Sequence, residues 1–312
     1  SRARTHTRAG DYGEGIIVTA AATSCGFAAI AGAPNAGKST LLNCLLGRKL
    51  AITSPKPQTT RTRILGILTW RRAQICLLDT PGIFAPRGKF DRAMVSAAWQ
   101  SRQEADRICL LVDAARGLDP KTRRSVAQLR KEKKSAVLVL NKIDLIAKAK
   151  ILPLADALQA SGVFTDTFMI AAKTGDGVSE LKKHLATAMP PGPWQFAAGQ
   201  TTDLTPDFMA AEITREQIMR QLAQELPYAA AVLPAGWEER RDGSLRIEQR
   251  ILVMRDGQKA IMIGKHGAML KRIGATARRA LEKSFGRKVH LFLEVEIEPD
   301  WQLRRGLRTE GG

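Results

Sequence analysis

The stretch Gly32-Ala33-Pro34-Asn35-Ala36-Gly37-Lys38-Ser39 decides the fold, because it fits the pattern G-x-x-x-x-G-K-[ST] of a phosphate-binding loop. The apolar run 26–31 precedes it, and residues 40–46, with helical apolar spacing, follow it. Between a strand and a helix, the glycines let backbone N–H groups turn inward, and the helix N-terminus attracts anions. We therefore expect a polyphosphate here, with Lys38 on its β- and γ-phosphates and Ser39 on a magnesium ion.

The balance of charge is the unusual feature of the composition. Of 312 residues, 49 are Lys or Arg and 30 are Asp or Glu, which gives a formal net charge of +19. The length suffices for two domains. The excess of positive charge favours a polyanionic partner, either nucleic acid or an anionic membrane surface, but it does not determine the fold. No apolar run approaches the roughly 18 residues of a membrane span.

The cysteines and the first residues bear on the cellular compartment. Four cysteines lie far apart without a C-x-x-C pair, which predicts reduced, buried thiols in a cytoplasmic-type compartment: Cys25, Cys44, Cys76 and Cys109. Residues 1–10 contain three arginines and no acid. We expect a flexible tail there, with a remnant of an organellar transit peptide, and hence a mitochondrial matrix location, as the alternative.

Up to about residue 190, apolar runs of strand length alternate with polar segments of helical length. The runs cover residues 26–31, 64–69, 74–78, 108–112, 136–140 and 168–171. This alternation predicts an α/β domain with a mostly parallel sheet and helices on both faces, in which ligands bind at the carboxyl ends of the strands. The alternation stops at the proline-rich stretch 189–193. We expect a tail at 1–22, this domain at 23–190 and a linker at 191–206.

The remainder of the chain has a different order of elements. Its patterns predict a helix at 211–226, strands at 229–238 and 245–253, a short helix at 258–263, a long helix ending at 285 and a strand at 289–297. Asp242-Gly243, between the first two strands, is a strong hairpin signal. The order α-β-β-α-α-β predicts a second, α+β domain at 207–303, followed by a tail at 304–312.

Two further motifs follow predicted strands of the first domain. Asp79-Thr80-Pro81-Gly82 closes the run 74–78, where a carboxylate reaches phosphate-bound magnesium and a glycine N–H can approach a γ-phosphate. Asn141-Lys142-Ile143-Asp144 closes the run 136–140. The Asp144 carboxylate can accept hydrogen bonds from guanine N1–H and the exocyclic amine, whereas adenine presents a lone pair there. With Asn141 bracing the loop and Lys142 over the base, the motif predicts a guanine nucleotide.

Together these motifs resemble the translation-factor-like GTPases, which carry five consecutive guanine-nucleotide motifs. The resemblance implies that Gln58-Thr59-Thr60-Arg61 supplies a switch threonine to magnesium and the γ-phosphate, either Thr60 or its competitor Thr59. The fifth motif falls on Ala171-Ala172-Lys173, where the family usually has Ser-Ala, and the backbone N–H of Ala172 is expected to contact the base. Because Ala171 replaces the serine, loop bracing is weakened more than guanine recognition.

Ile83 follows Gly82, where Ras-like enzymes keep a glutamine that orients the attacking water. An isoleucine cannot hydrogen-bond water, so the resemblance is to the hydrophobic-substituted subclass, and slow intrinsic GTP hydrolysis is expected. Some members of that subclass hold a potassium ion through an asparagine of the phosphate loop, here Asn35, where a cation stabilises charge on the β–γ bridge. A loop-bracing role for Asn35 is the equal alternative.

The resemblance implies a set of site residues. Nucleotide contacts fall on Gly32, Asn35, Ala36, Gly37, Lys38, Ser39, Thr40, Asp79, Gly82, Asn141, Lys142, Asp144, Ala172 and Lys173. Catalytic roles fall on Lys38, Asn35, Thr60 and Gly82. Magnesium is expected on Ser39, Thr60 and Asp79.

In the second domain, Gly264-Lys265-His266-Gly267 lies between two predicted helices, which is the setting of the GXXG loop of KH domains. Its glycines let the chain approach a nucleic-acid backbone, and Lys265 and His266 can face phosphates. An apolar stripe marks the core face of the following helix: Leu270, Ile273, Ala277, Ala280 and Leu281. Lys271 and Arg272 lie off this stripe and are expected to contact RNA phosphates, with a solvated helix surface as the alternative.

A GTPase domain with this phosphate loop and switch, followed by a type II KH domain entered through Glu225-Leu226-Pro227-Tyr228, resembles the Era family over residues 26–301. The resemblance implies a monomeric, GTP-hydrolysing protein that binds the 3′ end of small-subunit ribosomal RNA and acts in small-subunit assembly. It implies GTP or GDP and Mg²⁺ as cofactors, K⁺ at Asn35, and a cytoplasmic location that includes peripheral contact with the inner membrane. The alternatives are an RNA-modification or membrane-associated GTPase, and an RNA-binding protein that does not hydrolyse GTP.

Overall fold

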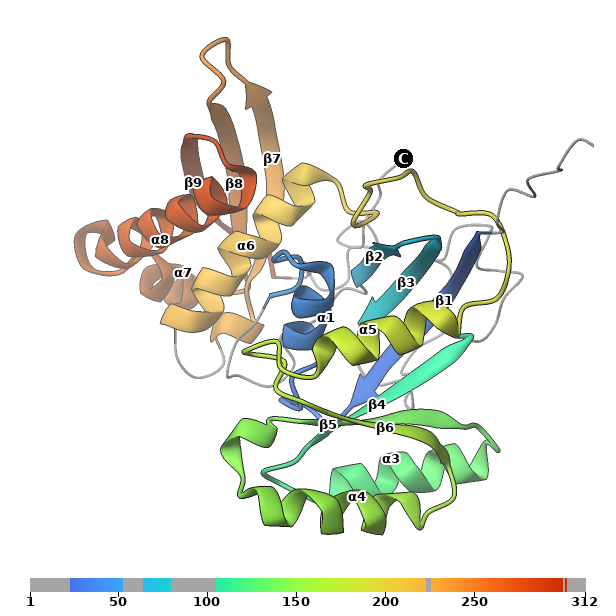
Figure 1. Ribbon diagram of the computed structural model, residues 1–312. Helices are drawn as coiled ribbons and strands as arrows, with labels where there is room; N and C mark the ends of the chain where they lie inside the picture. The colour runs from blue at the N-terminus through green and yellow to red at the C-terminus, as the bar shows by residue number, and fades with distance from the viewer. Residues whose placement is uncertain (1–22, 53–63, 80–104, 223–225, 300, 302–312) are drawn as a thin grey trace, which may run out of the picture.

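A computed structural model describes residues 23–52, 64–79, 105–222, 226–299 and 301 (Figure 1). These residues form a six-stranded sheet with the order β2-β3-β1-β4-β5-β6 and a three-stranded sheet with the order β7-β8-β9. Among the described residues, no helix has both the length and the apolar character needed to cross a membrane. The two sheets correspond to the two domains expected from the sequence.

The first sheet is parallel except for one antiparallel hairpin, β2–β3. Its strands are β1 (Ser24–Gly32), β2 (Ile64–Trp70), β3 (Ala73–Asp79), β4 (Arg107–Asp113), β5 (Ala136–Asn141) and β6 (Phe164–Ile170). Because β1 is buried over residues 25–31 and β5 over its whole length, both faces of the sheet are covered. That explains the continuous apolar runs in the sequence.

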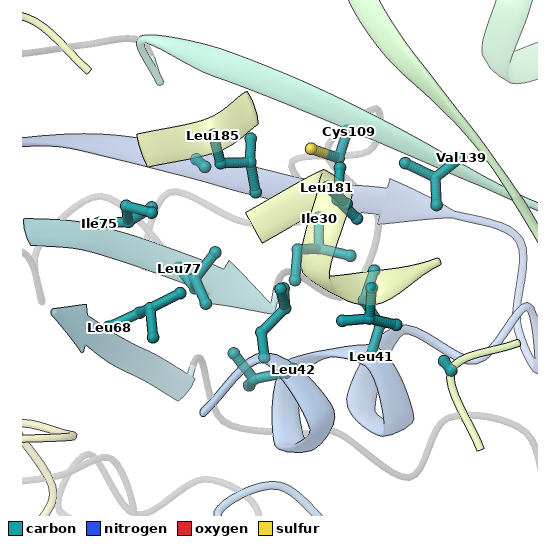
Figure 2. Close-up of a cluster of buried hydrophobic side chains, with 14 of the residues drawn as sticks. Ile30, Leu41, Leu42, Leu68, Ile75, Leu77, Cys109, Val139, Leu181 and Leu185 are labelled. Atoms are coloured by element: carbon teal, nitrogen blue, oxygen red, sulfur yellow. The ribbon is translucent and has the colours of Figure 1, made fainter. Parts of the chain in front are cut away.

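Helices cover this sheet on both faces, as expected. Those of the first domain are α1 (Lys38–Leu46), α3 (Pro120–Lys131), α4 (Ile151–Gln159) and α5 (Val178–Thr187), with short 3-10 turns η1 (Ile143–Leu145) and η2 (Lys148–Lys150). Side chains of α1 and α5 interlock with one face of the sheet, as Leu41, Leu42, Leu181 and Leu185 show in Figure 2. The helices α3 and α4 pack on the opposite face through Leu129 and Leu158, among others.

The second domain has the predicted order α-β-β-α-α-β. Its elements are α6 (Pro206–Gln221), η3 (Leu226–Tyr228), β7 (Ala231–Glu239), β8 (Leu245–Val253), α7 (Asp256–Ile263), η4 (Lys265–Gly267), α8 (Ala268–Phe285) and β9 (Val289–Ile297). β8 pairs antiparallel with β7 and parallel with β9. The predicted stripe on α8 faces the core, where Ile273, Ala277 and Leu281 are buried. The predicted fold class, an α/β phosphate-loop domain followed by an α+β domain, is confirmed.

Several element bounds differ from the expected ones, and the largest differences are at β6 and α6; α6 ends at Gln221 and not at 226, where the turn η3 begins. β6 begins at Phe164 and not at 168, because Thr165, Asp166 and Thr167 give its first half a polar sequence on a partly exposed strand. α6 begins at Pro206 and not at 211, since proline is compatible with the first turn of a helix, where its missing N–H would be unpaired anyway.

The segment expected as a linker lies along the first sheet. Gln74 in β3 is fully buried, and its side-chain oxygen accepts the backbone N–H groups of Gln195 (2.9 Å) and Phe196 (3.0 Å). The Ile67 N–H at the β2 edge donates to the Thr201 carbonyl (2.8 Å). The aperiodic segment 191–206 thus supplies a hydrogen-bond partner to a backbone group at the edge strand β2.

The four cysteines are free thiols; Cys25, Cys76 and Cys109 are buried and Cys44 is half-buried. Burial raises the pKa of Cys109 to about 12, so this thiol stays protonated at neutral pH.

Candidate nucleotide site and nucleic-acid interface

The phosphate loop joins β1 to α1 and depends on two glycines. Gly32 has φ +148° and a Cβ there would lie 2.3 Å from the Leu111 carbonyl oxygen. Gly37 has φ +102° and a Cβ there would lie 2.3 Å from Asn141 Nδ2. Both positions therefore require glycine for backbone conformation and for space.

Lys38, Ser39 and Thr40 form the first turn of α1, and their side chains are half-buried. Lys38 Nζ donates to the carbonyls of Gly32 (3.0 Å) and Ala33 (3.1 Å), which holds the ammonium group over the loop. The N-terminus of α1, with the positive end of the helix dipole, lies beside it. This combination can bind a polyphosphate.

Asn141 joins the phosphate loop to the fifth motif. Its Nδ2 donates to the Ala36 carbonyl (2.8 Å), and its Oδ1 accepts the backbone N–H of Ala172 (2.9 Å). The N–H that the family resemblance assigns to the guanine base is thus used by Asn141 in this structure. Ala171 offers no hydroxyl to Asn141, and the Asn141 oxygen takes the neighbouring N–H.

Lys142 holds the loop from the other side and involves a residue that sequence reasoning missed. Its Nζ donates to the Asn35 carbonyl (2.8 Å) and to Asp113 Oδ2 (2.6 Å). Asp113 ends β4 and is buried. A lone aspartate at the carboxyl end of the apolar run 108–112 was the available signal, because such ends form the ligand edge of a parallel sheet. The Lys142 ammonium group therefore braces the loop.

The remaining predicted residues lie around this centre or outside the described residues. Asp144 and Lys173 are exposed at the same edge of the sheet. The β1–β3 ladder pairs Ile30 with Asp79, which puts the Asp79 backbone beside the strand that leads into the phosphate loop. Thr59, Thr60, Gly82 and Ile83 fall outside the described residues.

The GXXG stretch forms a tight turn between α7 and α8. Gly264 (φ +73°), His266 (φ +51°) and Gly267 (φ +76°) all have positive φ, and the Gly267 N–H donates to the Gly264 carbonyl (3.1 Å). A Cβ on Gly264 would lie 2.7 Å from Met269 Cβ, whereas a Cβ on Gly267 would meet nothing within 4 Å. Gly264 therefore secures packing on α8, and Gly267 leaves the turn open to a ligand. Lys265 and His266 are exposed between them.

Next to this turn, Lys271 and Arg272 are exposed on α8. Arg272 Nε donates to Gln221 Oε1 (3.0 Å), and Gln221 Nε2 donates to Thr276 Oγ1 (2.5 Å). Arg272 is therefore partly committed to α6, while Lys271 projects from the helix surface.

Known proteins match both domains of the chain. A family model described as a 50S ribosome-binding GTPase matches residues 27–142, and a KH-domain model matches residues 225–302. A curated GTPase Era of Afipia carboxidovorans is 50% identical over 279 residues, with 89% of this chain and 91% of that protein covered. A GTPase Era of Caulobacter vibrioides is 45% identical, with 94% and 98% covered. The chain belongs to the Era family of GTPases.

Solved Era structures match the whole architecture. One, described as Era in complex with MgGDPNP and nucleotides 1506–1542 of 16S ribosomal RNA, has a TM-score of 0.80 at 39% identity, covering 92% of this chain and 100% of that one. An Aquifex aeolicus Era variant bound to GDP·AlF4⁻ has a TM-score of 0.79 at 38% identity, with 92% and 100% covered.

Membership of the Era family makes the chain a GTP-binding GTPase with a C-terminal KH domain. The expected family and enzyme class are confirmed. The alternatives, an RNA-modification or membrane-associated GTPase and an RNA-binding protein without hydrolysis, are not favoured by matches that span both domains.

Proposed function

We propose that this chain is a GTP-regulated switch that binds the 3′ end of small-subunit ribosomal RNA through its KH domain and acts in small-subunit assembly. The observation that carries the proposal is the match of both domains together to an Era structure that holds a GTP analogue and 16S rRNA. The open turn at Gly267, with Lys265 and His266 exposed beside it, supports an RNA backbone as the ligand.

Hydrolysis would proceed by in-line attack of water on the γ-phosphate, with GDP as the leaving group. Lys38 and the N–H groups of the loop would bind the phosphates where negative charge develops. We propose catalytic roles for Thr60 and Gly82 as well. Without a water-orienting glutamine at Ile83, intrinsic turnover is slow.

Magnesium fits the residues present. Ser39 supplies a hydroxyl in the first turn of α1, and Asp79 ends the strand that pairs with β1. Together with Thr60, which lies outside the described residues, they would supply hard oxygen ligands, which Mg²⁺ prefers. The bound ion would neutralise charge on the phosphates. We also propose that Asn35 holds K⁺. The backbone carbonyl of Asn35 accepts a hydrogen bond from Lys142, and this contact equally supports a role for Asn35 in bracing the phosphate loop.

Guanine selection would rest on Asp144, an exposed residue three positions after the Asn141 brace at the end of β5. Lys173 and Ala172 would complete the base pocket. For the base to use the Ala172 N–H, Asn141 Oδ1 would have to release it.

We keep the domain limits 23–190 and 207–303 as proposals, with 191–206 as the connection between them. A location in the bacterial cytoplasm is proposed because the curated relatives are bacterial proteins. We also propose that the protein is a monomer. Light scattering at several protein concentrations tests the monomer.

The experiment is binding of a small-subunit rRNA 3′-end oligonucleotide to the full chain and to Gly267→Asp. Gly267 has space for a side chain, and aspartate tolerates positive φ better than most residues, so this variant keeps its fold while adding negative charge at the turn. Gly286→Asp is the matched control, because Gly286 also has positive φ (+66°) and nothing within 4 Å of a Cβ. The proposal expects loss of binding in Gly267→Asp alone; equal binding by all three proteins would contradict it.

A further inference from the structure

The helix α3 and the turn that follows it carry a concentration of positive charge on the GTPase domain. Residues 116–134 contain eight Lys or Arg and two acids. Of these cations, Lys121, Arg124 and Lys131 share the solvent face of α3, opposite the buried Thr122, Val126 and Leu129. We call Lys121, Arg124, Lys131 and the following Lys133 the α3 basic face. Figure 1 shows α3 at the far end of the molecule from the KH domain.

Beside this face lies a hollow of about 280 Å³ between the end of α3 and the end of α4. Arg130, Lys133, Lys134 and Ser161 are among its lining residues. The Ser161 hydroxyl is buried and has no hydrogen-bond partner among the described residues. Arg130 Nη2 donates to the Ser161 carbonyl (2.8 Å), and Lys134 Nζ lies 3.4 Å from Glu132 Oε2. The excess of positive charge around the hollow nevertheless suits an anionic group such as a phosphate.

Lys133 has an unfavourable backbone conformation for a lysine. The Lys134 N–H donates to the Leu129 carbonyl (3.0 Å) and the Lys133 N–H to the Arg130 carbonyl (3.1 Å), which is the Schellman ending of a helix. Its left-handed position is held by Lys133 with φ +53°, where glycine is the usual residue. A lysine at this position is less stable than a glycine would be.

A simpler explanation covers only part of this pattern. Cations in the last turn of a helix interact favourably with its dipole, which accounts for Arg130 and Lys131. It does not account for Lys121 in the first turn of α3, where the dipole disfavours cations, for Arg124 beyond that turn, or for Lys133 in place of glycine. A ligand that is negative along its length accounts for all of them.

We propose that the α3 basic face binds backbone phosphates of structured RNA in the small subunit, separately from the RNA held by the GXXG turn. This inference rests on the proposed function. RNA fits better than a membrane, because none of the exposed large apolar side chains of the described residues belongs to α3, which therefore has no anchor to insert into lipid. Contacts of this kind contribute affinity and salt dependence but no sequence readout.

The test measures binding to intact small-subunit rRNA and to the 3′-end oligonucleotide at several salt concentrations. A triple variant, Lys121→Gln with Arg124→Gln and Lys131→Gln, removes three proposed phosphate contacts. The slope of log K against log salt for intact rRNA should fall by about 2 to 3, while oligonucleotide binding stays unchanged.

Lys133→Gly gives a second and independent reading. It should weaken binding of intact rRNA roughly three- to tenfold and yet raise the unfolding temperature, because glycine suits the left-handed position. Arg71→Gly is the matched control: Arg71 also has φ +53° and also carries one positive charge, but it lies in the β2–β3 turn near the other edge of the sheet. Arg71→Gly should raise the unfolding temperature without a comparable loss of binding to intact rRNA.

Binding of the same variants to vesicles containing phosphatidylserine is measured alongside. Three outcomes would overturn the inference: unchanged rRNA binding in both variants, equal losses of rRNA binding in Lys133→Gly and Arg71→Gly, or weaker vesicle binding with unchanged rRNA binding. If the unsubstituted protein did not bind the oligonucleotide, the proposed function of the KH domain would be wrong. That result differs from the three outcomes above, so the two proposals can fail separately.

Discussion

Lys49 forms an ion pair with Glu216, a carboxylate on α6 whose side chain is fully buried. Lys49 lies just after α1, where Asn43 Oδ1 accepts the N–H groups of Leu50 and Ala51 (2.8 Å each). Arg220 binds the same carboxylate at 2.6 Å. The pair thus connects the helix that begins at the phosphate loop to the helix that covers the KH sheet, as the closeness of α1 and α6 in Figure 1 illustrates.

Replacing Lys49 by methionine should therefore affect both domains. Glu216 would lose one cationic partner and keep the half-exposed Arg220, and we expect the free energy of unfolding to fall by about 1 kcal/mol. The ratio of RNA affinities in the GTP-analogue and GDP states should shrink as well. Urea unfolding and RNA titration measure the two effects. Arg287→Met, which breaks the exposed Arg287–Glu239 pair, is the control and should leave both nearly unchanged.

Asn141→Ala should weaken guanine-nucleotide binding strongly. The substitution leaves the Ala36 carbonyl and the Ala172 N–H without their partner in a buried site, at a cost of about 1 to 3 kcal/mol for each unpaired group. Fluorescent GDP titration should show at least a tenfold loss of affinity. Gln221→Ala removes comparable amide hydrogen bonds from the KH domain and should leave GDP affinity intact; a similar loss there would contradict the role of Asn141.

The cap of α3 should make part of the stability depend on pH. Asp119 Oδ1 accepts the Thr122 N–H (2.6 Å). Partial burial opposes ionisation of Asp119, but hydrogen bonds from Thr122 and Lys121 and the positive charge of Arg116 together outweigh it and hold the pKa below the ordinary 3.8. Because the folded-state pKa is depressed, the contribution is complete at neutral pH and is lost as pH falls through the folded-state value.

Asp119→Ala should accordingly lose about 1 kcal/mol of unfolding free energy at pH 7 and less at pH 3. Asp119→Asn retains an oxygen acceptor without the titration, so its difference from the unsubstituted protein should narrow at low pH. Urea unfolding at the two pH values provides the comparison, and a pH-independent difference for Asp119→Asn would refute this explanation.

The two glycines of the GXXG turn should differ in their tolerance of alanine. Gly264→Ala forces a Cβ to 2.7 Å from Met269 Cβ and 2.9 Å from its N, so we expect a loss of roughly 2 to 3 kcal/mol in stability. Gly267→Ala meets open space and should cost about 1 kcal/mol for its positive φ alone. Thermal unfolding of the two variants checks the order, and equal losses would mean that packing at Gly264 is unimportant.

The sequence predicts those parts of the molecule that local chemistry determines. Gly32 and Gly37 could be predicted because the conformation of the phosphate loop requires glycine at both positions. β8 and β9 have the predicted bounds because their apolar patterns end at turns. Three interactions could not be predicted: the hydrogen bond from Gln195 to Gln74, the Lys142–Asp113 ion pair and the Lys49–Glu216 ion pair. Each joins residues that are distant in sequence, and no local pattern encodes which polar groups meet after folding.

The most direct test of the central claim is the affinity of the full chain for the 3′-end oligonucleotide with a non-hydrolysable GTP analogue and with GDP, at one salt concentration. A switch requires different affinities in the two states, and couplings between sites typically amount to roughly 5- to 150-fold. We predict tighter binding with the analogue. Equal affinities in the two nucleotide states would contradict the account.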